Sequence, residues 1–253
     1  MLGKVVIIGV GLIGGSFALG LKRAGMVREV IGIGRHPEAT ARALELGIVD
    51  SVSTSYEDAL RGADLVLLAA PVAQTGPILA AVLPHLEQGT IVTDAGSTKC
   101  DVVAAARAAL KDRVHQFVPG HPIAGSESNG PDAALAGLYD GKKVVITALP
   151  ENTQQDVERV AAAWRTCGAI IHTLSPEDHD RVFAAVSHLP HLLAYALVDD
   201  VAAKPHADLL FQYAASGFRD FTTSPARRPK CGATSVWPTA PRCSPSWMHI
   251  WHN

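Results

Sequence analysis

A glycine-rich turn directly after the first apolar segment constrains this chain more than any other feature. The segment 4–8 (KVVII) is expected to be a buried strand, and it runs into GVGLIG at 9–14, a GxGxxG pattern that opens a helix expected over 12–24. The first glycine permits a tight turn, the second lets the backbone approach a pyrophosphate, and the third lets helix and strand pack closely. The residues expected to line a dinucleotide site are Gly9, Gly11, Leu12, Ile13 and Gly14. An ordinary strand-to-helix turn is the alternative.

Short apolar segments alternate with helical ones through the first two thirds of the chain. Strands are expected at 4–8, 30–33, 65–70, 90–94, 115–119, 143–148 and 169–173. Their continuous Val, Ile and Leu runs are typical of parallel strands that helices cover on both faces. We therefore expect an α/β fold, with a Rossmann-type, mainly parallel sheet domain over residues 1–173.

The alternation stops at residue 173, and a strong helix start follows. Ser175-Pro176-Glu177-Asp178 offers an N-cap serine, a proline at the first helical position and an acid three residues after the cap. A long apolar helix should run from there toward Val201, and 208–215 reads as another helical piece. Residues 174–222 are thus expected to form an all-helical domain.

Charge and cysteine usage narrow the class of partner. The chain has 22 basic and 24 acidic side chains, which leaves no overall field for nucleic acid or an anionic membrane. Its four cysteines form no CxxC pair, and the first apolar run is too short for a signal peptide or a membrane span. We therefore expect a cytoplasmic protein that binds a small molecule and binds neither nucleic acid nor a membrane.

The end of the second expected strand bears on cofactor choice. NAD-binding sites usually carry an acid there that accepts hydrogen bonds from the ribose 2′-hydroxyl. This chain has Gly34-Arg35-His36 instead, so no acid repels a 2′-phosphate and Arg35 could hold one with its planar fork. Arg35 and His36 are therefore assigned to the cofactor site, with NADP favoured over NAD. An exposed loop arginine without a ligand is the alternative.

Four polar segments complete the candidate site. They are DAGSTK at 94–99, GHPIAG at 120–125, SHLPH at 187–191 and GFRD at 217–220. The first two follow strands, where an open parallel sheet binds ligands beyond the carboxyl ends. Each segment has a structural alternative: Ser97 capping a helix that begins at Thr98, His121 as a turn residue, and His188 and His191 as core histidines.

Taken together and in this order, these segments resemble the prephenate/arogenate dehydrogenase family of tyrosine biosynthesis. The resemblance extends over residues 1 to about 222. It implies an oxidative decarboxylation in which a hydride leaves the ring carbon bearing the 4-hydroxyl for NAD(P), carbon dioxide is lost and the ring becomes aromatic. It also implies a homodimer held by the helical domain.

The resemblance assigns a role to each matching residue. His121 corresponds to the proton acceptor at the 4-hydroxyl, a role that suits an imidazole near neutral pH. Ser97 corresponds to a catalytic serine near that histidine, and Arg219 to an arginine that pairs with a substrate carboxylate. The remaining substrate-binding matches are His191, His188 and Ser187. His179 matches a structural histidine, and no metal is expected because no Cys or acidic cluster accompanies the histidines.

The final segment, 223–253, differs from the rest of the chain. Residues 221–253 contain no Asp or Glu, and the last 31 residues hold three of the four Trp and five of the 16 Pro. Residues Pro229–Asn253 can be written in codons that encode a different sequence when they are read two bases later. That sequence is EMWRDISVANRAALLAELDAYLAQ, which is similar to the family's ending. Because Trp and Met each have a single codon, part of that match does not depend on the choice of codons. A one-base frameshift near 222–224 is therefore expected, with an off-frame, disordered tail that leaves dimerisation and activity impaired.

Two other functions stay open on the sequence alone. The first is another two-domain NAD(P)-dependent enzyme, a hydroxyacid dehydrogenase or an imine reductase. Such enzymes often use a lysine of the interdomain helix, and this chain has no Lys between Lys143 and Lys204. The second is a cofactor-binding protein without turnover.

Overall fold

The computed structural model describes residues 1–125 and 128–222 of the chain. The chain divides into two compact units, the first over Met1–His179 and the second beginning at Asp180. The expected off-frame tail, 223–253, lies outside the described residues.

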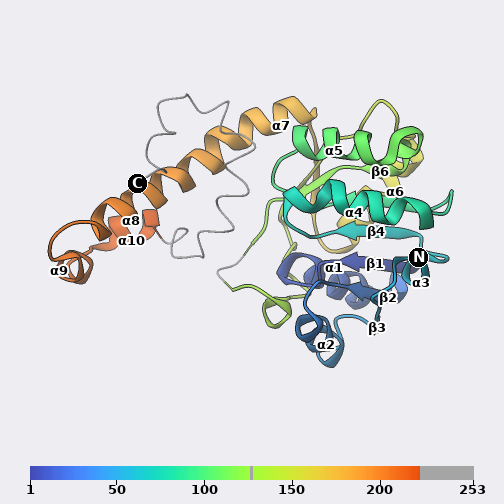
Figure 1. Cartoon of the computed structure of the whole chain (residues 1–253), viewed down its shortest axis with the longest axis horizontal. Coiled ribbons are helices and arrows are strands. Elements are labelled where there is room, and N and C mark those ends of the chain that lie inside the picture. The colour runs from blue at the N-terminus through green and yellow to red at the C-terminus, as the bar shows by residue number, and fades with distance from the viewer. Residues whose placement is uncertain (126–127, 223–253) are drawn as a thin grey trace. The chain divides into compact units, whose positions relative to one another are not determined.

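The first unit is built on a six-stranded parallel sheet with the order β3-β2-β1-β4-β5-β6. Val5 at its centre pairs with Val30 on one side and with Leu65 on the other. This is the strand order of a Rossmann fold, with the reversal between β1 and β4, and it confirms the predicted fold class. The strands, which can be followed from blue to green in Figure 1, are β1 (Leu2–Ile8), β2 (Val27–Ile33), β3 (Ser51–Val52), β4 (Leu65–Leu68), β5 (Ile91–Asp94) and β6 (Phe117–Val118).

Helices cover both faces of this sheet. Val5 and Ile7 of β1 are buried in one apolar cluster together with Phe17. The alternate residues Val6 and Ile8 are buried in a second cluster on the opposite face. Burial on both faces explains why the strands have continuous apolar sequences. The helices of the unit are α1 (Leu12–Arg23), α2 (Pro37–Glu45), α3 (Tyr56–Leu60), α4 (Thr75–Val82), α5 (Cys100–Leu110) and α6 (Gln154–Thr166), with 3-10 turns at Val72–Gln74, Leu83–His85, Lys111–Gln116 and Pro131–Ala133.

A second, three-stranded sheet corrects one expectation. The strands β7 (Gly120–Pro122), β8 (Lys143–Ile146) and β9 (Ile170–Thr173) form it in that order, and β7 runs antiparallel to β8. The sequence suggested a loop at 120–125, whereas His121 lies on a strand and pairs with Val145. A three-residue strand is too short to produce a recognisable apolar pattern.

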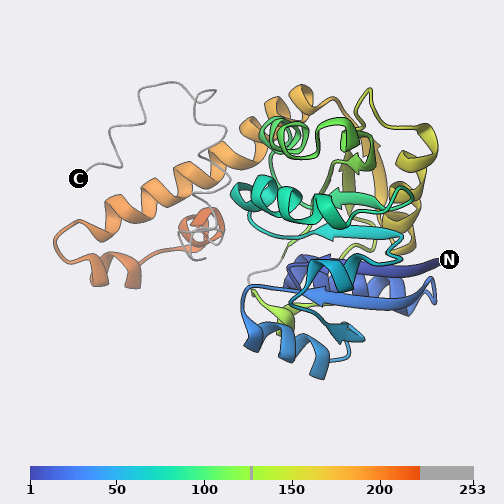
Figure 2. The same ribbon diagram turned by 45° about the vertical axis from the view of Figure 1, so that its right-hand side comes forward.

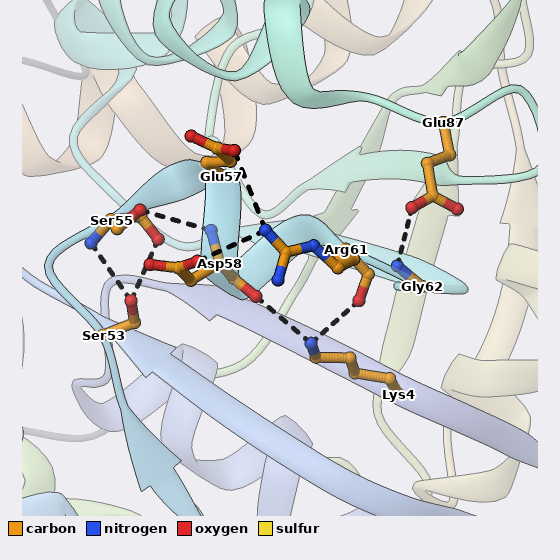
Figure 3. A network of polar contacts seen from close by, with 8 residues as sticks. All are labelled: Lys4, Ser53, Ser55, Glu57, Asp58, Arg61, Gly62 and Glu87. Atoms are coloured by element: carbon orange, nitrogen blue, oxygen red, sulfur yellow. Dashed lines mark hydrogen bonds and ion pairs between the residues drawn. The ribbon is translucent and has the colours of Figure 1, made fainter.

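The short elements β3 and α3 were also absent from the sequence prediction. Ser55 caps α3 by accepting the Asp58 amide (3.2 Å), and the ammonium of Lys4 on β1 donates to the carbonyls of Asp58 (3.4 Å) and Arg61 (2.9 Å) at the other end (Figure 3). A cation at the carbonyl end of a helix is favourable because those carbonyls lack helical partners. Capping at both ends thus supports a helix of five residues.

The second unit continues a helix that begins in the first. Ser175 accepts the amide of Asp178 (3.0 Å) and donates to its carboxylate (2.9 Å), which confirms the predicted helix start. The helical run comprises α7 (Pro176–Phe183), a π-helical turn (Ala184–His188) and α8 (Leu189–Ala202), drawn in yellow and orange in Figure 2. Pro190 has no amide hydrogen to donate into that turn, which accounts for the irregular hydrogen bonding there. Two short helices follow, α9 (Ala207–Gln212) and α10 (Ser216–Thr222), and α10 packs against α8.

Candidate dinucleotide and catalytic site

The glycine-rich turn has the geometry that a bound dinucleotide requires. Gly9 has φ of 101°, and a Cβ there would lie 2.5 Å from the carbonyl oxygen of Ala69. A Cβ on Gly14 would lie 2.4 Å from the carbonyl oxygen of Gly9, so helix α1 packs tightly on its strand. A Cβ on Gly11 would meet nothing within 4 Å, which leaves that backbone open to a ligand. These are the three roles expected of the motif, so the residues present fit a pyrophosphate at the N-terminus of α1.

A tyrosine from a distant segment supports the same turn. Tyr139 is fully buried, and its hydroxyl donates to the carbonyl of Ile13 (2.6 Å). Burial raises its pKa well above the ordinary value, so it stays a neutral donor. Leu12 is buried and Ile13 is half-buried, which places both in the wall of the turn.

The end of β2 carries the residues predicted to select the cofactor. Arg35 and His36 follow Ile33 and are exposed, with His36 at the N-cap position of α2. Because β1 and β2 are parallel and adjacent, these residues and the glycine turn lie at the same edge of the sheet. The position suits contact with the ribose end of a dinucleotide.

His121 is joined to a second histidine. Its Nδ1 lies 2.8 Å from Nε2 of His179, and the two ring centroids are 5.0 Å apart. His179 is fully buried in the first turns of α7, whereas His121 is half-buried. The sequence marked His179 only as structural, and no local pattern around it indicates its partner.

A buried ion pair lies between the segments that carry Ser97 and His121. Nζ of Lys99 is 2.6 Å from Oδ2 of Asp94, and the two side chains are 0% and 2% exposed. Asp94 ends β5, so the predicted position of the DAGSTK segment beyond a strand end is confirmed. The sequence shows a lysine five residues after the aspartate that ends the strand. It does not show that this lysine is buried.

The capping alternative for Ser97 is wrong. Helix α5 begins at Cys100, not at Thr98, and its N-cap residue is Lys99, whose side chain makes no capping hydrogen bond. Ser97 therefore lies in the loop before the helix, half-buried.

The remaining predicted substrate residues belong to the second unit. Ser187 and His188 lie in the π-helical turn, and His191 lies in the first turn of α8. His188 is buried and His191 is half-buried, and their spacing of three residues places them on neighbouring positions of the helix surface. Arg219 is exposed on α10. π-Helical turns occur frequently at functional sites.

Both units match sequence models of one family. The model described as "Prephenate dehydrogenase, nucleotide-binding domain" matches residues 17–173, and "Prephenate dehydrogenase, dimerization domain" matches residues 175–235. The chain belongs to the prephenate dehydrogenase family. The glycine turn precedes the first matched range, so its assignment depends on the geometry described above.

Individual relatives agree with this membership. The cyclohexadienyl dehydrogenase of Zymomonas mobilis is 36% identical over 97% of this chain and 84% of its own length. The prephenate dehydrogenase of Bacillus subtilis is 36% identical over 86% of this chain, which spans only 59% of that relative. The crystal structure of Aquifex aeolicus prephenate dehydrogenase in complex with hydroxyphenyl propionate and NAD+ has a TM-score of 0.87 and 37% identity, over 95% of this chain and 84% of that one.

Family membership confirms the predicted class of the protein. It is an NAD(P)-dependent oxidoreductase of the prephenate and arogenate dehydrogenase type, with a Rossmann-type domain followed by a helical dimerisation domain.

Proposed function

We propose that this protein oxidatively decarboxylates prephenate, arogenate or both, in the synthesis of tyrosine. The observation that carries the proposal is the contact between His121 and His179 in the same unit as a dinucleotide turn, in a chain of this family. A bound nicotinamide would accept the hydride from the ring carbon that bears the 4-hydroxyl. Loss of the carboxylate as carbon dioxide then leaves its electron pair in the ring, which becomes aromatic.

His121 is the proposed proton acceptor at the substrate hydroxyl, and its contact with His179 selects the required tautomer. A neutral imidazole carries one proton, and Nε2 of His121 accepts a proton only when that proton is on Nδ1. Nδ1–H of His121 then donates to Nε2 of His179, and His179 carries its own proton on Nδ1. The proton that His121 takes from the hydroxyl returns to the oxygen when the phenol forms, so no net proton is consumed.

The other predicted residues are assigned to binding. Ser97 would hydrogen-bond near the hydroxyl, and Arg219 would pair with a substrate carboxylate through its planar guanidinium. His191, His188 and Ser187 are proposed to line the substrate site from the helical domain. Support comes from the π-helical turn and from the match to the dimerisation-domain model.

NADP is the proposed preferred cofactor, with NAD also accepted. Arg35 supports this preference because it is exposed at the end of β2, where NAD-specific sites commonly carry an acid. The A. aeolicus structure contains NAD+, as that protein's own ligand. Relative affinities for the two cofactors test the preference.

A homodimer is the proposed assembly. The run Pro176–Ala202 is, among the described residues, the one helical stretch long and apolar enough to cross a membrane, and 17% of its most apolar window is buried. Large apolar side chains are exposed in the helical unit, including Val186 (67%), Leu209 (52%) and Tyr213 (77%). Because this region matches a dimerisation domain, a second copy of the chain is the proposed cover for that surface.

A cytoplasmic enzyme without a membrane or nucleic-acid partner accords with the free thiols of Cys100 and Cys167.

One assay tests the proposal. The purified chain is supplied with prephenate or arogenate and with NAD+ or NADP+, and both reduced nicotinamide and carbon dioxide are measured. Formation of the two products in equal amounts from either substrate supports the proposal. Oxidation of a 2-hydroxy acid or reduction of a cyclic imine, with neither cyclohexadienyl substrate used, would favour the alternative enzyme class.

A further inference from the structure

The buried ion pair of Asp94 and Lys99 has a position that its contribution to the core does not explain. Its two charges are 2.6 Å apart, and both side chains are buried from solvent. Burying two charges has a large desolvation cost, and an apolar pair of similar volume would often stabilise a core as well or better. The backbone groups that the pair holds in place therefore bear on its role.

The carboxylate of Asp94 joins two segments that are distant in the sequence. Its Oδ2 accepts the amide hydrogen of Gly96 (2.8 Å), and its Oδ1 accepts the amide hydrogen of Gly120 (3.0 Å). Nζ of Lys99 donates to the carbonyl of the same Gly120 (2.6 Å). One ion pair thus fixes both the amide and the carbonyl of the residue before His121 and the amide of the residue before Ser97.

The glycines at these two positions are a consequence of the close approach. A Cβ on Gly96 would lie 2.8 Å from Oδ2 of Asp94, and a Cβ on Gly120 would lie 3.0 Å from the carbonyl oxygen of Asp94. A side chain at Gly96 would have to push the carboxylate away, and one at Gly120 would press on rigid backbone. The DAGSTK and GHP sequences therefore carry their glycines where the ion pair meets the backbone.

We propose that Asp94 and Lys99 are positioning residues that set the spacing between the Ser97 loop and the His121 strand. The pair acts through Gly96 and Gly120, while His179 contacts the ring of His121. The inference depends on the proposed function for the roles of Ser97 and His121. It adds two buried residues that act through the backbone of the segments carrying Ser97 and His121.

The test compares single and double variants of the full chain. Lys99→Met and Asp94→Asn each leave a buried partner unpaired, so both should lower the thermal midpoint and lower kcat. The double variant removes both charges, so its thermal midpoint should return close to that of the wild type. Its kcat should stay low, on the order of 100-fold below wild type, because the hydrogen bond from Lys99 to the carbonyl of Gly120 is lost in it. KM and the Kd of NAD+ should change much less than kcat.

A surface ion pair supplies the control. Lys22 and Asp50 have the same separation of 2.6 Å but are 25% and 43% exposed. Lys22→Met should therefore leave kcat unchanged. Recovery of kcat together with the thermal midpoint in the double variant, or no loss of kcat in any variant at Asp94 or Lys99, would overturn the inference.

A spectroscopic readout separates this inference from the proposed function. The imidazole nitrogen signals of His121, assigned through a His121→Asn variant, should shift or broaden in Lys99→Met and stay unchanged in Lys22→Met. An inactive wild-type chain would contradict the proposed function, and these signals would still decide the positioning role. Signals of His121 that are the same in Lys99→Met and in the wild type would refute it.

Discussion

Nδ1 of His121 and Nε2 of His179 lie 2.8 Å apart, so the orientation and tautomer of the half-buried imidazole depend on the fully buried one. A histidine here takes the place that a carboxylate has in many catalytic pairs, where it orients the base and fixes its proton. A neutral partner offers orientation without a fixed negative charge.

Substitutions of His179 should distinguish its role as a hydrogen-bond partner of His121 from its role in packing. His179→Gln can present an amide oxygen near the position of Nε2 and should retain most of kcat. His179→Leu keeps apolar volume but cannot accept the hydrogen bond, so kcat should fall on the order of 100-fold with little change in the Kd of NAD+. Equal kcat values for the two variants would show that the hydrogen bond has no part in turnover.

Arg35 should control the choice of cofactor. Arg35→Asp replaces a possible phosphate ligand with a repelling charge, so the Kd of NADP+ should rise about 10- to 100-fold, while that of NAD+ falls or stays constant. Arg165 on α6 is exposed and paired with Glu158 (2.5 Å), and Arg165→Asp makes the same charge change elsewhere. Isothermal titration with both cofactors measures the effect. An unchanged Kd for NADP+ in Arg35→Asp would contradict the 2′-phosphate assignment.

Cys167 should make the fold sensitive to alkaline pH. Burial, aided by Asp140 and opposed by Arg23, raises the pKa of this thiol to about 12. Above pH about 9 the unfolded chain releases the thiol proton while the folded chain retains it, so the free energy of unfolding should fall by about 1.4 kcal/mol per pH unit toward pH 12. Urea unfolding at several pH values measures this slope.

The two described cysteines allow a matched comparison. Cys167→Ala should lack this component of the alkaline slope, whereas Cys100→Ala, at a half-buried position, should keep it. If the free energy of unfolding falls equally steeply with pH in Cys167→Ala and in the wild type, other groups cause the loss of stability at alkaline pH.

The segment 223–253 is predicted to be an off-frame reading of the gene. Resequencing the coding DNA should reveal a frame that encodes EMWRDI after residue 222. The frame-corrected chain should form a dimer in sedimentation and should turn over faster than the 253-residue chain, because the added helix would cover apolar surface of the dimerisation domain. DNA in which no frame encodes that segment would end the prediction.

The sequence predicted the parts of the fold that local patterns determine. The turn at 9–14 was predictable because close backbone contacts at Gly9 and Gly14 exclude a side chain, and the long parallel strands were predictable because burial on both faces leaves continuous apolar runs. Strand β7 was missed because three residues carry no periodicity. The orienting role of His179 and the burial of Lys99 depend on contacts between segments 58 and 21 residues apart, and single-sequence patterns contain no record of such contacts.

The central claim is that His121 is the base of a dehydrogenase that acts on prephenate or arogenate. Its most direct test is kcat of the wild type and of His121→Asn with each substrate, alongside the Kd of NAD+ for both proteins. We expect reduced nicotinamide and carbon dioxide from the wild-type chain, a loss of about 10²- to 10⁴-fold in kcat for His121→Asn, and an unchanged Kd. A His121→Asn variant with kcat close to that of the wild type would contradict it.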